Sequence, residues 1–224
     1  MPVRRDWRAA ADMALDRKRQ NSGEWQLGVL KDLSRVRLKS GLSFTLKADR
    51  FWFLRHGQTE WNVSGISQGH IDVDINEIGR EQAIAAGKML QQLGIAEIVA
   101  SDLSRAKNTA LLSGLEIGVH NISVDPRLRE RSFGTLEGAA SPRDAWLSDD
   151  AEVERLEVFA RRTMAGICAA LNRPNVLICA HGGNLMVLEA MLEIVMPSDY
   201  RTNAMPICFV RRESRWVCNA LAIE

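Results

Sequence analysis

Two short apolar runs, each leading to a histidine and then a glycine, constrain the fold of this 224-residue chain more than any other feature. The run at residues 51–54 leads through an arginine to His56, and the run at residues 176–180 leads directly to His181. Runs this apolar are typical of strands buried on both faces of a parallel sheet. Ligands bind at the carboxyl edge of such sheets, so we expect both histidines to lie together at one ligand-binding edge.

Helical and strand patterns alternate along most of the chain. Apolar residues at helical spacing predict four helices, at Glu77–Leu93, Ser104–Leu115, Glu152–Leu171 and Asn184–Val195. Besides the two apolar runs, strands are predicted at Ile95–Ala100 and in a closing hairpin of Ile207–Val210 with Arg215–Asn219. Strands that alternate with helices indicate an α/β fold, a three-layer α/β/α sandwich with a mainly parallel central sheet.

The N-terminal part of the chain differs from the rest in charge. Residues 1–50 contain 12 Lys and Arg against 6 Asp and Glu, whereas residues 51–224 contain 17 against 22. This asymmetry, together with sparser apolar runs, predicts a basic N-terminal extension at residues 1–48 before a compact domain at residues 49–224.

Two elements are predicted within the extension. Apolar spacing indicates a helix at Asp6–Gln20, and alternation at Leu42–Leu46 indicates an edge strand that forms a hairpin with the strand at residues 50–54. We expect both elements to pack on the domain. The alternative is that the basic extension docks an acidic partner, a second subunit or nucleic acid.

The composition excludes several classes of protein. Hydrophobic residues make up 46% and charged residues 25%, a balance typical of globular proteins and not of disordered ones. No apolar run approaches the length of a membrane span, and the N-terminus lacks the apolar core of a secretory signal. The four cysteines occur singly, and a net charge of +1 argues against nucleic acid as a partner. We therefore expect a cytoplasmic protein.

Several short motifs around the two histidines resemble those of one enzyme family. They are Arg55–Asn62, Gln68–Asp72, Ser101–Ala110, Leu128–Gly138 and His181–Asn184. In their order, and over roughly residues 50–220, they resemble the histidine phosphatase superfamily and in particular its phosphoglycerate mutase-like branch. The resemblance implies a reaction in which a phosphoryl group is transferred to a histidine.

The resemblance also implies a role for each main site residue. His56 is the expected nucleophile, and His181 is expected to bind the phosphoryl oxygens in its protonated form. Arg55 and Arg105 resemble the paired guanidinium groups of the family, whose forked donors suit phosphate oxygens. Glu130 matches the acid that protonates the leaving oxygen and later activates water. Because cationic side chains take the place of a metal ion, no metal and no cofactor are expected.

Four further residues are predicted to contact the substrate, namely Asn62, Gln68, Gly69 and Gly182. Simpler roles remain open for several of the predicted site residues. Asn62 also suits a helix cap, and Gln68 and Gly69 suit an ordinary turn. Glu130 stands among arginines that could pair with it at the surface, and the two predicted arginines of the site could likewise face solvent.

The segment between Glu130 and His181 bears on whether the chain is a phosphatase or a mutase. The mutases that it resembles have a long basic insert there, whereas only 50 residues separate the two positions in this chain. After the predicted helix is removed, Ala139–Ala151 remains, with Arg143 as its only basic residue and Trp146 as its large apolar one. A short lid of this kind retains a bisphosphate poorly. The sequence therefore predicts a metal-independent phosphomonoester hydrolase that acts through phosphohistidine.

Two alternatives remain open at this point. The chain would be a cofactor-dependent phosphoglycerate mutase if the N-terminal extension supplied the missing cations, from Arg35, Arg37 or Lys39. A non-catalytic module that binds a phosphorylated ligand would be indicated by loss of the catalytic residues, and none is lost. The expected substrate is a phosphorylated small molecule or a phosphoprotein, and neither its identity nor the oligomeric state follows from the sequence.

Overall fold

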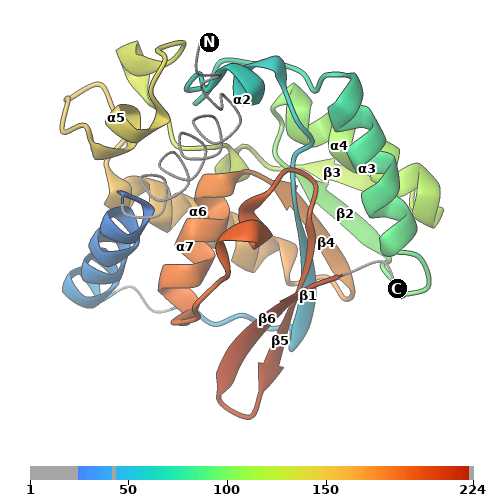
Figure 1. The fold of residues 1–224 in the computed structure, drawn as a ribbon. Helices are drawn as coiled ribbons and strands as arrows, with labels where there is room; N and C mark the ends of the chain where they lie inside the picture. The colour runs from blue at the N-terminus through green and yellow to red at the C-terminus, as the bar shows by residue number, and fades with distance from the viewer. Residues whose placement is uncertain (1–24, 42–43, 222–224) are drawn as a thin grey trace, which may run out of the picture.

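The computed structural model describes residues 25–41 and 44–221 of the chain (Figure 1). Its strands are β1 (Arg50–Arg55), β2 (Glu97–Ala100), β3 (Ile122–Val124), β4 (Val176–Ala180), β5 (Pro206–Arg212) and β6 (Arg215–Ala220). The described strands form one six-stranded sheet in the order β3-β2-β4-β1-β5-β6. Strands β1 to β4 pair in parallel, whereas β5 pairs antiparallel with both β1 and β6. The predicted α/β fold with a mainly parallel sheet is confirmed.

Helices cover both faces of this sheet (Figure 1). The longer ones are α3 (Glu77–Met89), α4 (Ser104–Ile117), α6 (Leu156–Ala170) and α7 (Gly182–Leu192), and the shorter ones are α2 (Glu60–Ser64) and α5 (Pro142–Leu147). Helices α3 and α4 pack on one face, and α6 and α7 pack on the other. None of the described helices is long and apolar enough to cross a membrane.

The apolar residues 51–54 of β1 and 176–180 of β4 are buried because their alternate side chains face opposite helical layers. Phe51 and Phe53 of β1 are buried with α6 and α7, whereas Trp52 and Leu54 are buried with α3 and α4. Strand β4 alternates in the same way, and all of its residues are buried. Burial of one such side chain stabilises the fold by about 1.5–3 kcal/mol, so the carboxyl edge of the sheet has a rigid support.

Some helix boundaries differ from the predicted ones. Helix α6 begins at Leu156 because the residues from 151 to 155 form a turn and an extended stretch. Helix α7 begins directly after His181, whose backbone N–H donates to the Asn184 side chain at 3.0 Å. Helix α5 lies within the segment Ala139–Ala151, which the sequence predicted as a short lid. Its start is set by the Ser141 cap and by Pro142 in the first turn.

The described part of the N-terminal extension is a helix at residues 25–40. It packs on the α6–α7 side of the sheet through Val29 and Leu33, which are 1% and 0% exposed. The helix predicted at Asp6–Gln20 lies outside the described residues. The predicted edge strand at Leu42–Leu46 is wrong over its described part, because residues 44–46 are coil and β4 and β5 occupy both sides of β1. The domain boundary at residue 48 stays a prediction.

Candidate active site

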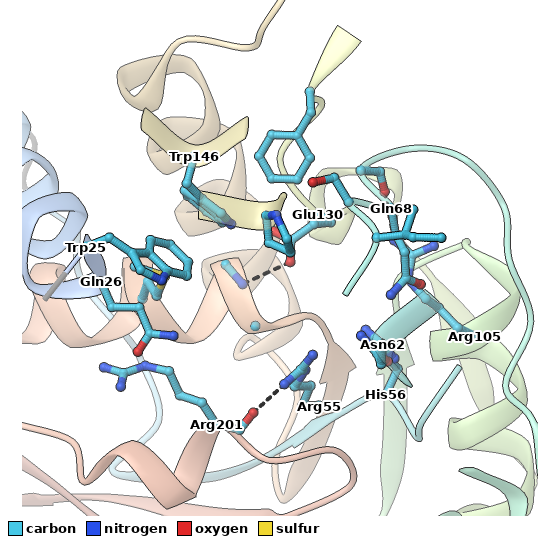
Figure 2. Close-up of a pocket in the computed structure, with 18 residues that line it drawn as sticks. Trp25, Gln26, Arg55, His56, Asn62, Gln68, Arg105, Glu130, Trp146 and Arg201 are labelled. Atoms are coloured by element: carbon cyan, nitrogen blue, oxygen red, sulfur yellow. Dashed lines mark hydrogen bonds between the residues drawn. The ribbon is translucent and has the colours of Figure 1, made fainter. Parts of the chain in front are cut away.

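A pocket of about 190 Å³ opens at the carboxyl ends of β1 and β4 (Figure 2). Eight predicted site residues line it, namely Arg55, His56, Asn62, Gln68, Gly69, Arg105, Glu130 and Gly182. The ninth, His181, lies beside His56, with 5.2 Å between the two ring centroids. The sheet edge therefore brings together motifs that are far apart in the sequence.

The His56 ring is held in one tautomer by its own backbone segment. Its Nδ1 atom lies 2.8 Å from the Gly57 carbonyl oxygen, which can only accept, so Nδ1 carries the proton. The side chain is 3% exposed, and burial together with the charges of Arg55 and Arg105 lowers the pKa of His56 well below its ordinary value of 6.5. The ring is therefore neutral, and its Nε2 atom presents an unprotonated lone pair.

The His181 ring has the opposite orientation of donor and acceptor. Arg105 donates from Nε to the Nδ1 atom of His181 at 3.3 Å, so the proton of the neutral ring lies on Nε2. This buried Nε2 atom has no hydrogen-bond partner among the described residues. Burial, followed by the charges of Arg105 and His56, lowers the pKa of His181 well below 6.5. The structure thus favours a neutral N–H donor and not the protonated ring expected from the sequence.

Arg105 is the second residue of α4, and from the sequence it could have been a solvent-facing residue. In the structure it is fully buried. Its two terminal nitrogens donate to the carbonyl oxygens of Gly69 (2.7 Å) and Ile71 (3.0 Å), and each retains a second N–H. Burial lowers the pKa of Arg105 to about 10, so the guanidinium stays charged near neutral pH. The Gly69 carbonyl group therefore orients the Arg105 guanidinium.

Arg55 extends from the end of β1 into the pocket. One of its terminal nitrogens donates to the Arg201 carbonyl oxygen, and its buried Nε atom has no partner among the described residues. Burial lowers the pKa of Arg55, and the charge of Glu130 partly opposes that effect. Gly182 lies against this guanidinium, since a Cβ atom there would be 3.5 Å from Arg55 Nε. Neither predicted arginine is a solvated surface residue.

The Glu130 carboxyl group is oriented by two backbone N–H groups. Oε1 accepts from Arg131 at 2.9 Å, and Oε2 accepts from Gly183 at the start of α7 at 3.0 Å. The Glu130 backbone carbonyl in turn accepts from His70 Nε2 at 2.9 Å and from Arg162 at 2.7 Å. Both the side chain and the main chain of this residue are therefore fixed at the rim of the pocket.

The arginines that flank Glu130 in the sequence do not pair with its side chain. Arg127 forms an ion pair with the nearby Asp125, and Arg129 forms one with Asp102. The Arg131 guanidinium donates to two backbone carbonyls. A Cβ atom at position 183 would lie 2.0 Å from Glu130 Oε1, so Gly183 allows the close approach that positions the carboxyl group. The surface ion-pair alternative for Glu130 is thus not supported.

Asn62 is both a helix cap and a pocket residue. Its side-chain oxygen accepts from the Thr59 N–H at 3.1 Å and from Asn203 at 3.2 Å, which completes the N-terminal cap of α2. The side-chain N–H₂ group takes no part in the cap, and it can donate to a ligand in the pocket that Asn62 lines. Gln68 is 8% exposed, and its side-chain oxygen has no partner among the described residues.

The model of the histidine phosphatase superfamily, branch 1, matches residues 51–218. The chain belongs to this superfamily. Glucosyl-3-phosphoglycerate phosphatase from Mycolicibacterium vanbaalenii is 37% identical over 179 residues, which cover 69% of this chain and 78% of that protein. The solved structure of a mycobacterial glucosyl-3-phosphoglycerate phosphatase in complex with VO3 has a TM-score of 0.61 at 27% identity, and the match covers 77% of this chain and 98% of that one.

Another relative is much longer than this chain. Agropine synthesis reductase from Rhizobium rhizogenes is 31% identical over 176 residues, which cover 74% of this chain but only 40% of that protein. The chain thus spans about two fifths of the length of this relative.

Within the described residues, no three or more His, Cys, Asp or Glu side chains gather in a group that could hold a metal ion.

The segment Ala139–Ala151 supplies no cation to the pocket lining. Trp146 of α5 lines the pocket and is 7% exposed, whereas Arg143 is exposed and lies outside the lining. The basic residues Arg35, Arg37 and Lys39 of the N-terminal helix are also absent from the lining. The cations that the sequence left as a mutase alternative are therefore not at the site.

Sequence reasoning missed several residues that shape this site. Trp25 and Gln26 line the pocket. The sequence signal for their helix was the four-residue spacing of Trp25, Val29 and Leu33. Arg201 also lines it and had no recognisable signal. His70 belongs to the motif Gln68–Asp72 but was given no role of its own, yet its Nε2 atom contacts the Glu130 carbonyl oxygen. Glu137 joins these segments, because its carboxylate accepts from the backbone N–H groups of residues 70, 71 and 133.

Proposed function

We propose that the chain is a metal-independent phosphomonoesterase that forms a phosphohistidine at His56. The observation that carries this proposal is the neutral, tautomer-locked His56 ring, whose Nε2 lone pair lies beside the donors of Arg55, Arg105 and His181. A nucleophilic nitrogen surrounded by fixed N–H donors suits transfer of a phosphoryl group, because catalysis of this reaction depends mainly on positioning and on stabilisation of charge.

The first half of the proposed reaction transfers the phosphoryl group to the protein. His56 Nε2 forms a bond to phosphorus while the bond from phosphorus to the ester oxygen breaks. The two arginines and the Nε2–H of His181 donate to the equatorial phosphoryl oxygens, with the Asn62 amide as a further donor. Glu130, in its protonated form, gives its proton to the leaving oxygen, which departs as an alcohol.

The second half returns the protein to its starting state. The Glu130 carboxylate takes a proton from a water molecule as that water attacks phosphorus. The nitrogen–phosphorus bond breaks, inorganic phosphate leaves, and His56 recovers its neutral ring. The positive charge that a metal ion supplies in other phosphatases comes here from Arg55 and Arg105, which supports the proposal of a metal-independent reaction.

Hydrolysis is favoured over mutase activity by the charges around the pocket. A mutase retains a bisphosphate, which requires cations beyond those that bind the transferred group. The additional arginine in the lining, Arg201, is already paired with Glu189. The name of a relative, glucosyl-3-phosphoglycerate phosphatase, also supports hydrolysis of a phosphorylated small molecule. The cytoplasmic location stays a prediction.

Trapping of the phosphoenzyme tests the proposal. The protein is mixed with a ³²P-labelled phosphomonoester, quenched in alkali and digested, and the label is mapped. We expect alkali-stable, acid-labile label on the peptide that contains His56. His56→Ala should remain folded and lose at least about 10³-fold in turnover, and EDTA should have no effect on the wild type. Label on another residue, or a variant with a tenth of the activity, would overturn the mechanism, and ligand binding without turnover would support a non-catalytic module instead.

A further inference from the structure

The pocket has an outer end that the proposed chemistry does not use. Figure 2 shows Trp25, Gln26 and Arg201 at the opposite side of the pocket from His56 and Arg105. Trp146 completes this side, with 6.4 Å between its ring centroid and that of Trp25 and an angle of 32° between the planes. Two tryptophans thus form an apolar wall on the side of the pocket away from His56.

This wall is firmly attached to the rest of the molecule. Trp25 and Gln26 are the first described residues of the helix at residues 25–40, which is held in the core by Val29 and Leu33. Trp146 is held by contact with Phe133, at 5.4 Å between ring centroids. The family model begins at residue 51, so the part of the wall formed by the N-terminal helix lies outside the matched stretch.

The polar groups at the outer end are uncharged overall. The Arg201 guanidinium donates to Glu189, which neutralises it, yet its buried Nε atom has no partner among the described residues. Gln26 adds an uncharged amide beside it (Figure 2). These groups suit neutral hydroxyl groups, whereas a carboxylate would meet no uncompensated cation and would lose its hydration. Tryptophan rings suit the apolar face of a ring.

We propose that the helix at residues 25–40 forms a specificity wall of the active site and selects an uncharged, ring-shaped leaving group, as in a monosaccharide phosphate. Trp25 contacts the face of the ring, and Gln26 and Arg201 donate to its hydroxyl groups. This inference rests on the proposed function, because the wall can select a leaving group only if a phosphoryl group is transferred at His56.

Steady-state kinetics with matched phosphoesters test the inference. The ring probes are glucose 6-phosphate and ribose 5-phosphate, the acidic acyclic probes are phosphoserine and 3-phosphoglycerate, and acetyl phosphate reports on the His56 end alone. We expect the better ring probe to exceed the better acidic probe in kcat/KM by at least about tenfold. Trp25→Ala should lower kcat/KM for the ring probes by about tenfold, mainly through KM, and should leave acetyl phosphate within about twofold.

Three further variants separate contact with the substrate from loss of folding. Trp25→Phe should recover most of the activity on ring probes, and Gln26→Ala should lower it by a few fold without disturbing the core. Leu27→Ala is the matched control, because Leu27 lies on the same helix and is 57% exposed. Melting temperatures of these three variants should agree with that of the wild type.

The possible results distinguish this inference from the proposed function. A preference for phosphoserine or 3-phosphoglycerate would overturn the inference, and so would an equal loss for acetyl phosphate and ring probes in Trp25→Ala. Either result could occur with phosphohistidine still formed at His56, which would leave the proposed function intact. Absence of phosphohistidine in the wild type would instead overturn the proposed function itself.

Discussion

The two ends of the pocket are built from different parts of the molecule. The inner end comes from the carboxyl ends of β1 and β4, and His56, Arg105 and His181 are 3%, 0% and 0% exposed there. The outer end comes from the helix at residues 25–40, from α5 and from the 3₁₀ helix Ser198–Arg201. Strand ends held in the core suit groups that must be positioned toward a reacting atom. The side chains that the peripheral helices present to the pocket can change while the buried side chains of those helices stay in the core. The difference indicates that reaction chemistry and leaving-group selection can vary independently.

The largest expected effect concerns acid catalysis at the rim of the inner end. Glu130→Gln keeps the shape of the side chain and removes its proton, so turnover of alkyl phosphates should fall by roughly 10²–10⁴-fold. An activated aryl phosphate, whose leaving group needs little protonation, should lose much less in the phosphorylation step. Single-turnover kinetics on both substrates measure the ratio.

Arg105→Ala is the comparison variant for this test. It removes charge stabilisation and not a proton, so both substrates should lose alike, by about 10²–10³-fold. Equal losses for both substrates in Glu130→Gln would reduce Glu130 to a structural residue and would leave the inner end without a general acid.

A second, smaller effect concerns the glycine that positions Glu130. In Gly183→Ala the new Cβ atom would meet Glu130 Oε1 at 2.0 Å and the Trp146 ring at 2.9 Å, so the carboxyl group must move. We expect about a 10²-fold loss for alkyl phosphates, with the same leaving-group dependence as loss of the acid itself.

Gly182→Ala provides the matched comparison for the glycine variant. Its Cβ atom would make only ordinary contacts, the nearest at 3.5 Å from Arg55 Nε, so any loss should be equal for alkyl and aryl phosphates. A leaving-group-dependent loss in Gly182→Ala, or none in Gly183→Ala, would show that the backbone N–H of residue 183 does not position the acid. Stopped-flow phosphorylation rates decide between these outcomes.

The inner end could be predicted from the sequence and the outer end could not. His56 and His181 follow apolar strands directly, so their placement at one edge follows from the topology of parallel sheets. Trp25 and Arg201 reach the pocket only through the packing of peripheral segments, which periodicity does not reveal. The neutral state inferred for the His181 ring could not be predicted from the sequence either, because it depends on complete burial beside Arg105.

A third prediction concerns the acceptor of the phosphoryl group. Because the lid and the N-terminal helix bring no unpaired cation to the outer end, water should accept the group from His56 more often than a sugar acid does. Hydrolysis of a phosphomonoester should exceed conversion of 3-phosphoglycerate to 2-phosphoglycerate by at least about tenfold. Addition of 2,3-bisphosphoglycerate should not raise mutase turnover, as measured by coupled assay.

Efficient mutase turnover that depends on the bisphosphate would contradict this prediction. In that case Arg35→Ala and Lys39→Ala would test whether the basic face of the N-terminal helix reaches the pocket during turnover. Deletion of residues 1–40 is a poorer test, because Val29 and Leu33 belong to the core and their loss would destabilise the domain.

The smallest expected effect is a dependence of stability on pH that comes from the inner end alone. The pKa values of His56 and His181 in the folded protein lie well below the ordinary value of 6.5, chiefly because both rings are buried. Below pH 6.5 the unfolded chain binds more protons than the folded one, so the free energy of unfolding falls as the pH falls. It should be constant above that pH and should lose about 1.4 kcal/mol per pH unit for each histidine below it.

Urea unfolding at several values from about pH 7.5 down to pH 5 measures this slope. His181→Asn should lower the difference in bound protons between the unfolded and folded states by about one. The loss of unfolding free energy between pH 7.5 and pH 5.5 should then be smaller by roughly 1 kcal/mol. His120→Asn is the control, because His120 is exposed and is not part of the pocket lining, and it should leave the slope unchanged. An unchanged slope in His181→Asn would mean that this ring is protonated in the folded protein. The inner end would then bind the phosphoryl group with a third positive charge, and the neutral donor inferred from the contact with Arg105 would be wrong.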